Sequence, residues 1–179
     1  MITDLSKRNL ELAFHRAARG NLVRDPSDAC NISPTQEGPH FGQMAGEVLL
    51  ITISSFAFRL LTIFHVANTP AARAYYSEDA ADRPVSEFFA EVANLCCGAF
   101  NRELAQSFSH LAMSIPYTLS SRCMAFLGEL RPQFLSSYGI TINDSVQMQA
   151  TLCMHCSAPV EVMVSAARPD DNSGALELF

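Results

Sequence analysis

Positive charge is scarce in this chain of 179 residues. Only 12 Lys and Arg residues stand against 18 Asp and Glu residues, which gives a formal net charge of -6 at pH 7. The basic residues form no run, whereas binding to the phosphate backbone of a nucleic acid requires clustered cations. We therefore expect no nucleic-acid partner.

The sequence also lacks a long uninterrupted apolar stretch. The longest one, residues 48–66, is broken by Ser54, Ser55, Arg59 and His65, which favours strands over a membrane span. The N-terminal residues show no basic region followed by an apolar core, so no secretory signal is evident. These absences predict a soluble, cytoplasmic protein without a membrane span.

Several common catalytic and cofactor-binding motifs are absent. The glycines form no phosphate-binding loop, and neither Gly-x-Ser-x-Gly nor His-Glu-x-x-His occurs. Cys153 and Cys156 form a Cys-x-x-Cys, but no second cysteine pair lies at zinc spacing, and on a strand these two would point to opposite faces. We expect structural cysteines, no metal site and no cofactor of the protein's own.

Hydrophobic residues, in contrast, are plentiful at 49% of the chain, enough for one sizeable core. Residues 1–42 are predicted to add an amphipathic helix, Asp4 to Arg19, and a long loop of Pro, Ser, Asn and Gly. Residues 43–179 are predicted to form the main domain. The fold class that we expect is α+β, with one long helix packed on an antiparallel β-sheet and the N-terminal helix added to it.

The main domain reads as a series of strand and helix patterns. Before the long helix, we expect a hairpin over 46–66 that turns near Ser54 and a short helix over 70–76. After it, we expect a strand over 107–119, with Pro116 on an edge, at a bulge or beyond the strand end. A helix over 123–138 ended by Gly139 and a hairpin over 140–166 follow.

The long helix, Pro84 to about Gln106, has two different sides. Asp82 is placed to cap it and Pro84 lies in its first turn. At about 100° per residue, one broad apolar side gathers Val85, Phe88, Phe89, Val92, Leu95, Cys96, Ala99 and Phe100, with Cys97 near its border. The opposite side carries a narrow polar stripe of Glu87, Glu91, Asn94, Gly98 and Asn101.

Gly98 is an unusual residue for a helix interior, where glycine costs about 1 kcal/mol relative to alanine. Close approach of another backbone would explain it. A solvated face without function is the other interpretation of the stripe.

The spacing of three residues adds a resemblance. Glu91, Asn94 and Pro116 fit Glu-x2-Asn-x21-Pro, which resembles the signature (Asp or Ser)-x3-Glu-x2-Asn-x21-Pro of the CheX/CheC/FliY family of chemotaxis phosphatases. The first position falls on Glu87, an acid but neither Asp nor Ser. No second Glu-x-x-Asn occurs, so the chain is similar to the single-motif CheX type.

This resemblance implies a function and a partner. The function would be hydrolysis of the aspartyl phosphate on a phosphorylated CheY-like response regulator, which itself carries the Mg²⁺. Asn94 would orient the attacking water and Glu91 would dock the regulator, while Glu87 contacts the same partner and Gly98 leaves room for it. A homodimer is also implied. The alternative is a CheX-like module that binds a regulator, or another chemotaxis or flagellar protein, without catalysis.

Overall fold

The structure is a computed structural model that describes residues 1–35, 46–77 and 85–164. In chain order its elements are α1 (Asp4–Asn21), β1 (Cys30–Pro34), β2 (Glu47–Ser54), β3 (Phe58–Val66), α2 (Pro70–Tyr76), α3 (Val85–Leu104), β4 (Ala112–Met113), β5 (Tyr117–Ser120), the 3₁₀ helix η1 (Ser121–Leu130), β6 (Phe134–Ile142) and β7 (Val146–Cys156). The predicted α+β class is confirmed.

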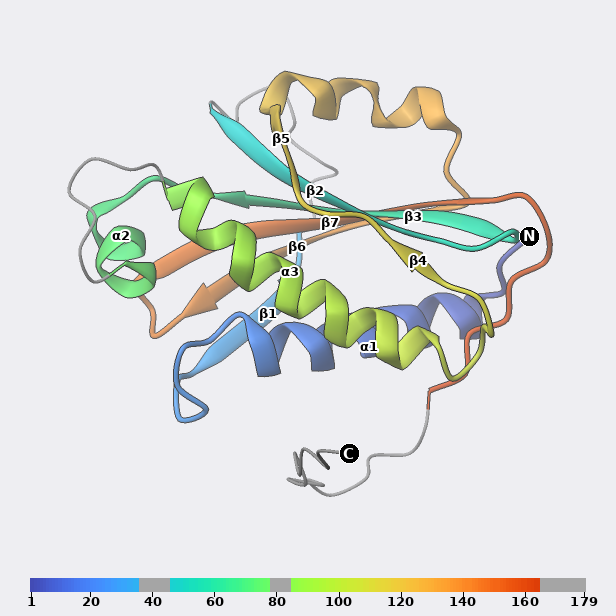
Figure 1. Cartoon of the computed structure of the whole chain (residues 1–179), viewed down its shortest axis with the longest axis horizontal. Coiled ribbons are helices and arrows are strands. Elements are labelled where there is room, and N and C mark those ends of the chain that lie inside the picture. Colours follow the sequence, from blue (N-terminus) through green and yellow to red (C-terminus); the bar gives the residue numbers. More distant parts are fainter. Residues whose placement is uncertain (36–45, 78–84, 165–179) are drawn as a thin grey trace, which may run out of the picture.

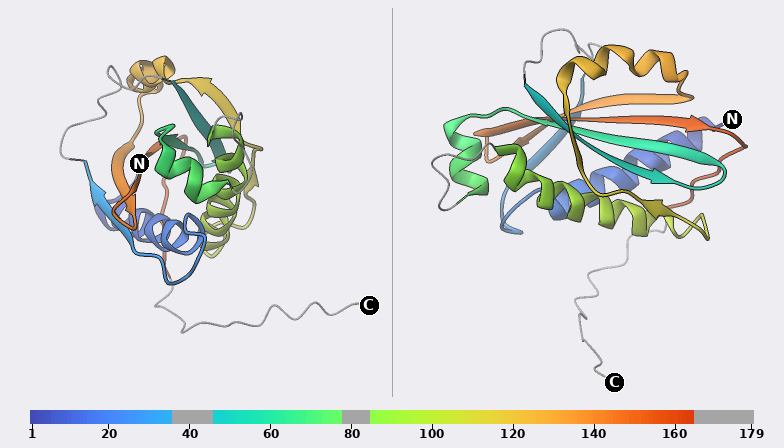
Figure 2. Two further views of the ribbon diagram at one scale, coloured as in Figure 1. Left: turned by 90° about the vertical axis from the view of Figure 1, so that its left-hand side faces the viewer. Right: turned by 45° about the horizontal axis from the view of Figure 1, so that its top comes forward.

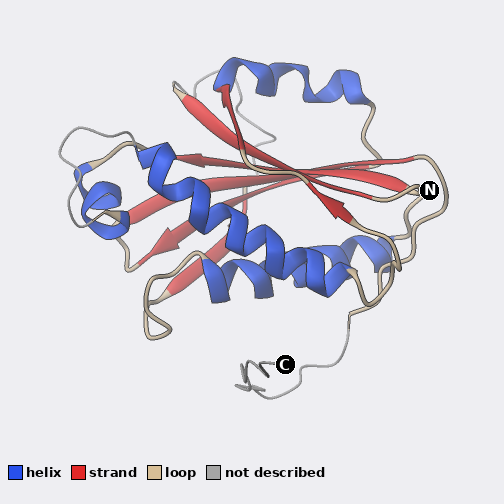
Figure 3. Ribbon diagram, viewed as in Figure 1, coloured by secondary structure: helices blue, strands red, loops and turns tan. Residues whose placement is uncertain are grey.

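The strands form one antiparallel sheet in the order β1-β6-β7-β3-β2-β4, with β5 also paired to β2. Helices α1 and α3 lie side by side on one face of this sheet, and η1 lies on the other (Figures 1, 2 and 3). The two faces therefore carry different layers. None of the described helices is long and apolar enough to cross a membrane.

The main core lies between the sheet and the helices α1 and α3. Phe14 of α1 is fully buried, and its ring centroid lies 5.6 Å from that of Phe100 of α3 and 5.5 Å from that of Tyr138 of β6. Phe89 of α3 meets Phe64 of β3 at 5.7 Å. These aromatic contacts fix α3 on the sheet and leave its other side facing outward.

The opposite face of the sheet has a smaller core under η1. Met124 and Leu127 of η1 pack against side chains of β2, β3 and β7, among them Val48, Ile63 and Cys153. The 3₁₀ helix ends at Leu130, and Arg131 turns the chain with a positive φ of 47°. The cover that η1 provides is therefore partial.

The helices α1 and α2 and the hairpin β2–β3 confirm the sequence predictions, and local chemistry explains the helix starts. The Thr3 side chain caps α1 by accepting from the Ser6 N–H at 3.1 Å. Thr69 caps α2 in the same way, with the Ala72 N–H as donor at 3.2 Å. Such caps satisfy donors that the first helical turn leaves unpaired.

The predicted helix over 123–138 is only half right. Residues up to Leu130 form η1, but Phe134–Ile142 is strand β6, and Gly139 lies inside that strand opposite Gln149. Pro132 removes the N–H that a continuing helix needs. Beyond it, Phe134, Tyr138, Ile140 and Ile142 are buried on one side of the sheet, a spacing of even steps that a strand satisfies.

Two further predictions are wrong, one of a loop and one of a strand. The long loop predicted after Gly20 contains β1, which pairs with β6, so Cys30–Pro34 forms an edge of the sheet. Residues 160–164, expected as the second arm of a hairpin, form no strand. Val160 instead makes an isolated parallel bridge with Ile2, and Val162 is buried in the main core.

Some predictions fall outside the described residues. These are the cap Asp82, the first-turn Pro84 and the boundary between residues 42 and 43. Whether the chain divides there stays a prediction. Within the described part, α1 shares the core of the sheet.

His15 of α1 gives the fold a predicted pH dependence. Its Nε2 is buried without a hydrogen-bond partner among the described residues, and its ring lies 5.0 Å from that of Tyr138. Burial lowers the pKa of His15 below 6.5, and the nearby Arg19 cation adds to this. The imidazole therefore takes up a proton more readily in the unfolded chain than in the folded one. Protonation then favours unfolding, so the free energy of unfolding should fall as the pH drops below about 6.5.

Urea unfolding at a series of pH values checks this expectation. His15→Gln should flatten the curve between neutral pH and mildly acidic pH, whereas His110→Gln, which removes an exposed imidazole, serves as the control. Equal pH dependence in the unmutated protein and His15→Gln would count against a buried neutral imidazole.

Candidate functional site

Helix α3 carries the candidate site, and the core holds it in place. Its buried side chains are Val85, Phe89, Ala93, Cys96, Cys97, Phe100 and Leu104. Near its start, the Ser86 Oγ donates to the Glu47 Oε2 of β2 at 3.0 Å. The helix is therefore anchored along its length, and its outward face is presented as a rigid surface.

Glu91 and Asn94 lie on this outward face, as the spacing predicts. Glu91 is exposed and Asn94 is half-buried. Among the residues that the structure describes, neither side chain forms a hydrogen bond or an ion pair. Because residues three apart are neighbours on a helix surface, a carboxylate and an amide without partners stand next to each other, and both can contact a second molecule.

Gly98 continues the same line of the helix, and nothing described in the molecule requires a glycine there. A Cβ added to Gly98 would meet only the Arg102 Nη1, at 3.7 Å, which is ordinary contact with a flexible tip. Alanine would fit and favour the helix by about 1 kcal/mol. The glycine therefore suits a surface that another chain approaches closely.

Glu87 lies one turn before Glu91 and is also exposed. Pro116 comes from another part of the chain and lies between β4 and β5, the two short strands at the sheet edge. Both strands pair with β2, against which α3 packs, so Pro116 belongs to the edge of the sheet that adjoins the helix. Pro116 is predicted on an edge, at a bulge or beyond the strand end, and it lies beyond the end of β4.

The buried side of α3 is rotated relative to the prediction. Leu95, predicted as a core residue, is 56% exposed, whereas Cys97, expected near the border, is fully buried. The sheet lies under Cys97, and Leu95 points outward, about 40° around the helix from Glu91. Leu95 thus adds an exposed apolar side chain beside the polar stripe. The sequence pattern does not identify it as exposed, although its angle of only about 40° from Glu91 already places it next to the stripe.

The cysteines near the site are structural. Cys96 and Cys97 are both buried, and burial raises the pKa of the Cys97 thiol to about 12. The thiol is therefore protonated at neutral pH and a poor nucleophile. Cys153 lies under η1, while Cys156 packs at the main core, so this pair does face opposite sides of the sheet. Groups of His, Cys, Asp and Glu suited to a metal ion do not occur among the described residues.

Sequence comparison gives no relative, whereas the fold has clear neighbours. No protein-family model matches the chain, and no curated protein matches it. The chemotaxis protein CheX from Vibrio vulnificus superposes with a TM-score of 0.59 at 14% identity, covering 82% of this chain and 99% of that one. The chain thus has the CheX/CheC-like fold.

Two other solved structures share this fold. CheX from Borrelia burgdorferi, solved as a CheX-CheY-BeF3-Mg²⁺ complex, has a TM-score of 0.52 at 12% identity and covers 84% of this chain and 97% of its own. The FliM middle domain from Vibrio alginolyticus has a TM-score of 0.53 at 8% identity, with 81% and 90% covered. The fold is therefore not confined to CheX proteins.

Proposed function

We propose that the protein is a phosphatase that hydrolyses the aspartyl phosphate of a CheY-like response regulator docked on α3. The observation that carries the proposal is the pair formed by Glu91 and Asn94, adjacent on the outward face of a rigid helix and without partners among the described residues. The CheX/CheC-like fold and the binding of CheY by a CheX of this fold support the choice of partner.

Two side chains, Glu91 and Asn94, are enough for this reaction because of the chemistry of an aspartyl phosphate. It is an activated acyl phosphate, and the regulator supplies the Mg²⁺ and the lysine that balance the phosphoryl charge. The missing part is a water held in line with the departing carboxylate. An amide both donates and accepts hydrogen bonds, so the Asn94 side chain can orient that water without acting as a base.

Glu91 has a different role in this proposal. Its carboxylate, one turn before Asn94, pairs with the active-site lysine of the regulator and fixes the position of the helix over the phosphate. A charge pair at such a contact contributes to binding as well as to positioning. Glu87 and Leu95 extend the same surface, and Gly98 lets the regulator approach the helix backbone.

A homodimer belongs to the same proposal. β5 pairs with β2 along one edge and lies at the end of the sheet, where Tyr117 is 51% exposed and Leu119 is 39% exposed. An open strand edge with apolar side chains is suited to pairing with another chain. A second copy of this chain would cover it.

The second candidate function is docking without turnover. Two observations favour it: Glu87 stands where the family signature has Asp or Ser, and the FliM middle domain shares the fold. In that case α3 would serve as a binding surface for a regulator or another chemotaxis or flagellar protein.

A phosphate-release assay separates the two functions. Receiver domains phosphorylated with labelled acetyl phosphate are mixed with a catalytic amount of the full chain, and loss of label is followed against spontaneous hydrolysis. We expect release to accelerate with multiple turnovers. Binding without acceleration would favour the docking module. If no receiver in a panel of CheY-like domains is bound or dephosphorylated faster, both proposed functions are wrong.

A further inference from the structure

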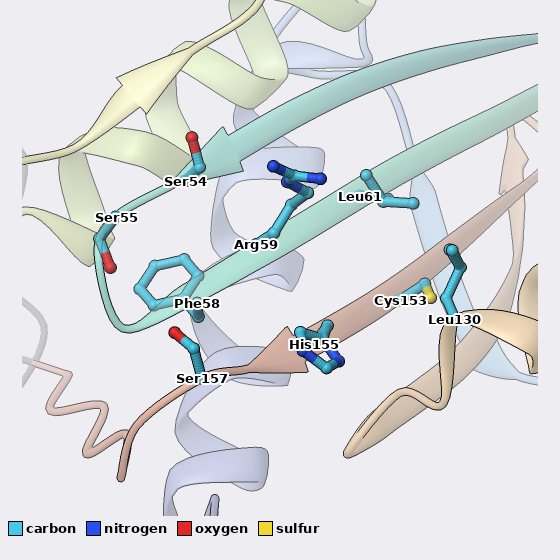
Figure 4. Close-up of a pocket in the computed structure, with 9 residues that line it drawn as sticks. All are labelled: Ser54, Ser55, Phe58, Arg59, Leu61, Leu130, Cys153, His155 and Ser157. Carbon is cyan, nitrogen blue, oxygen red and sulfur yellow. The ribbon is translucent and has the colours of Figure 1, made fainter.

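A pocket with a volume of about 460 Å³ opens on the face of the sheet opposite α3. It lies where η1 ends, so that Leu130 forms one of its walls and the strands β2, β3 and β7 form its floor (Figure 4). Its size falls within the range of small-molecule sites in proteins, about 300 to 1,000 Å³.

The register of the sheet brings the polar groups of the pocket together. Ser54 pairs with Arg59 across β2 and β3, and Arg59 pairs with His155 across β3 and β7. Directly paired residues point to the same face, with their Cβ atoms about 5 Å apart. A hydroxyl, a guanidinium and an imidazole therefore stand in one row that crosses three strands, although they are far apart in sequence.

The next row of the sheet supplies two apolar side chains to the pocket. Leu61 and Cys153 are paired there and belong to the small core under η1. Together with Leu130 they give the pocket one apolar side, while the row of Arg59 gives it a polar side. Such a combination holds a ligand that has a polar head and an apolar body.

Charge indicates which head the pocket accepts. Among the described residues Arg59 forms neither a hydrogen bond nor an ion pair, and the His155 ring has no partner either. The described residues that line the pocket include no carboxylate, although acidic residues outnumber basic ones by 18 to 12 in the chain. A guanidinium binds carboxylate and phosphate oxygens through paired N–H donors. No described residue that lines the pocket supplies such anionic oxygens to Arg59.

We propose that this pocket binds a small organic anion. Its carboxylate or phosphate head lies against the Arg59 guanidinium, with the His155 ring and the Ser54 hydroxyl as further donors. Its apolar body packs on Leu61, Cys153 and Leu130. Because the pocket and α3 lie on opposite faces of the sheet, the anion and a protein docked at Glu91 and Asn94 occupy separate sites.

Three probes test the parts of this proposal on the full chain by NMR titration of backbone amides. Phenylacetate has both the charged head and the apolar body, phenylacetamide has the same shape without charge, and inorganic phosphate is a head alone. We expect phenylacetate to shift the amides of Arg59, Leu61, Cys153 and His155. Phenylacetamide and phosphate should each bind at least tenfold more weakly.

The matched variants are Arg59→Gln and Arg122→Gln. Both remove an exposed guanidinium, but Arg122 lies in η1 and does not line the pocket. Arg59→Gln should weaken phenylacetate binding about tenfold or more, the scale of a lost charge-assisted hydrogen bond, while Arg122→Gln leaves it unchanged. Equal affinity of Arg59→Gln and the unmutated protein would overturn the proposal, as would equal binding of phenylacetamide or of phosphate, or no shift with phenylacetate.

Discussion

Replacing Asn94 with alanine should slow dephosphorylation of the regulator by about a hundredfold or more, the scale expected when a reacting water loses its orientation. Affinity for the regulator should change little, because Glu91 and the rest of the α3 surface remain. The melting temperature should also stay close to that of the unmutated protein, since Asn94 is half-buried and holds no hydrogen bond among the described residues. Turnover, affinity and melting are measured on the same preparation.

Glu91→Ala is the informative comparison for that result. It should weaken docking as well as turnover, because a carboxylate paired with the lysine of the regulator contributes to both. Asn94→Asp keeps the shape of the side chain but removes its N–H donors, and it should slow turnover as much as Asn94→Ala does. Full activity of Asn94→Ala on a regulator that the unmutated protein dephosphorylates would rule out the proposed role of the amide.

The sequence predicts the exposed stripe of α3 better than it predicts the helix rotation. Glu87 and Glu91 are exposed as expected, yet Leu95, predicted in the core, is exposed, and Cys97, predicted near the border of the core, is fully buried. A helical pattern with apolar residues on more than half of its circumference fits several rotations about equally well. Which one is adopted depends on α1 and the sheet, against which α3 packs, and these contacts are not local in sequence.

Non-local pairing also explains the other differences. Cys30–Pro34 has the composition of a loop and becomes strand β1 because β6 offers it a partner more than 100 residues later. Leu135 fits a helical pattern with Leu127 and Leu130, but Pro132 separates them and Leu135 is a 37% exposed strand residue. The row of Ser54, Arg59 and His155 requires the register of three strands, which a single sequence does not provide.

Gly98→Leu should produce the second large effect, a loss of affinity for the phosphorylated regulator by about a hundredfold or more, equivalent to about 2.7 kcal/mol. The free protein has room for the first atom of the new side chain, because an added Cβ meets only the flexible Arg102 Nη1 within 4 Å. Leucine also favours a helix over glycine by several tenths of a kcal/mol. The variant should therefore be slightly more stable alone and yet fail to dock.

The chain offers a matched control for this variant in Gly20, near the end of α1. A Cβ added there meets nothing within 4 Å, as at an open surface. Gly20→Leu should leave docking and turnover unchanged, which separates the effect of position from that of removing a glycine. Since Gly98→Leu alters the approach of the partner and leaves the Asn94 amide in place, it should lower affinity first, and saturating regulator should restore part of the turnover. Undiminished affinity of Gly98→Leu would show that no partner approaches the helix backbone at this point, and docking on this face of α3 would then be wrong.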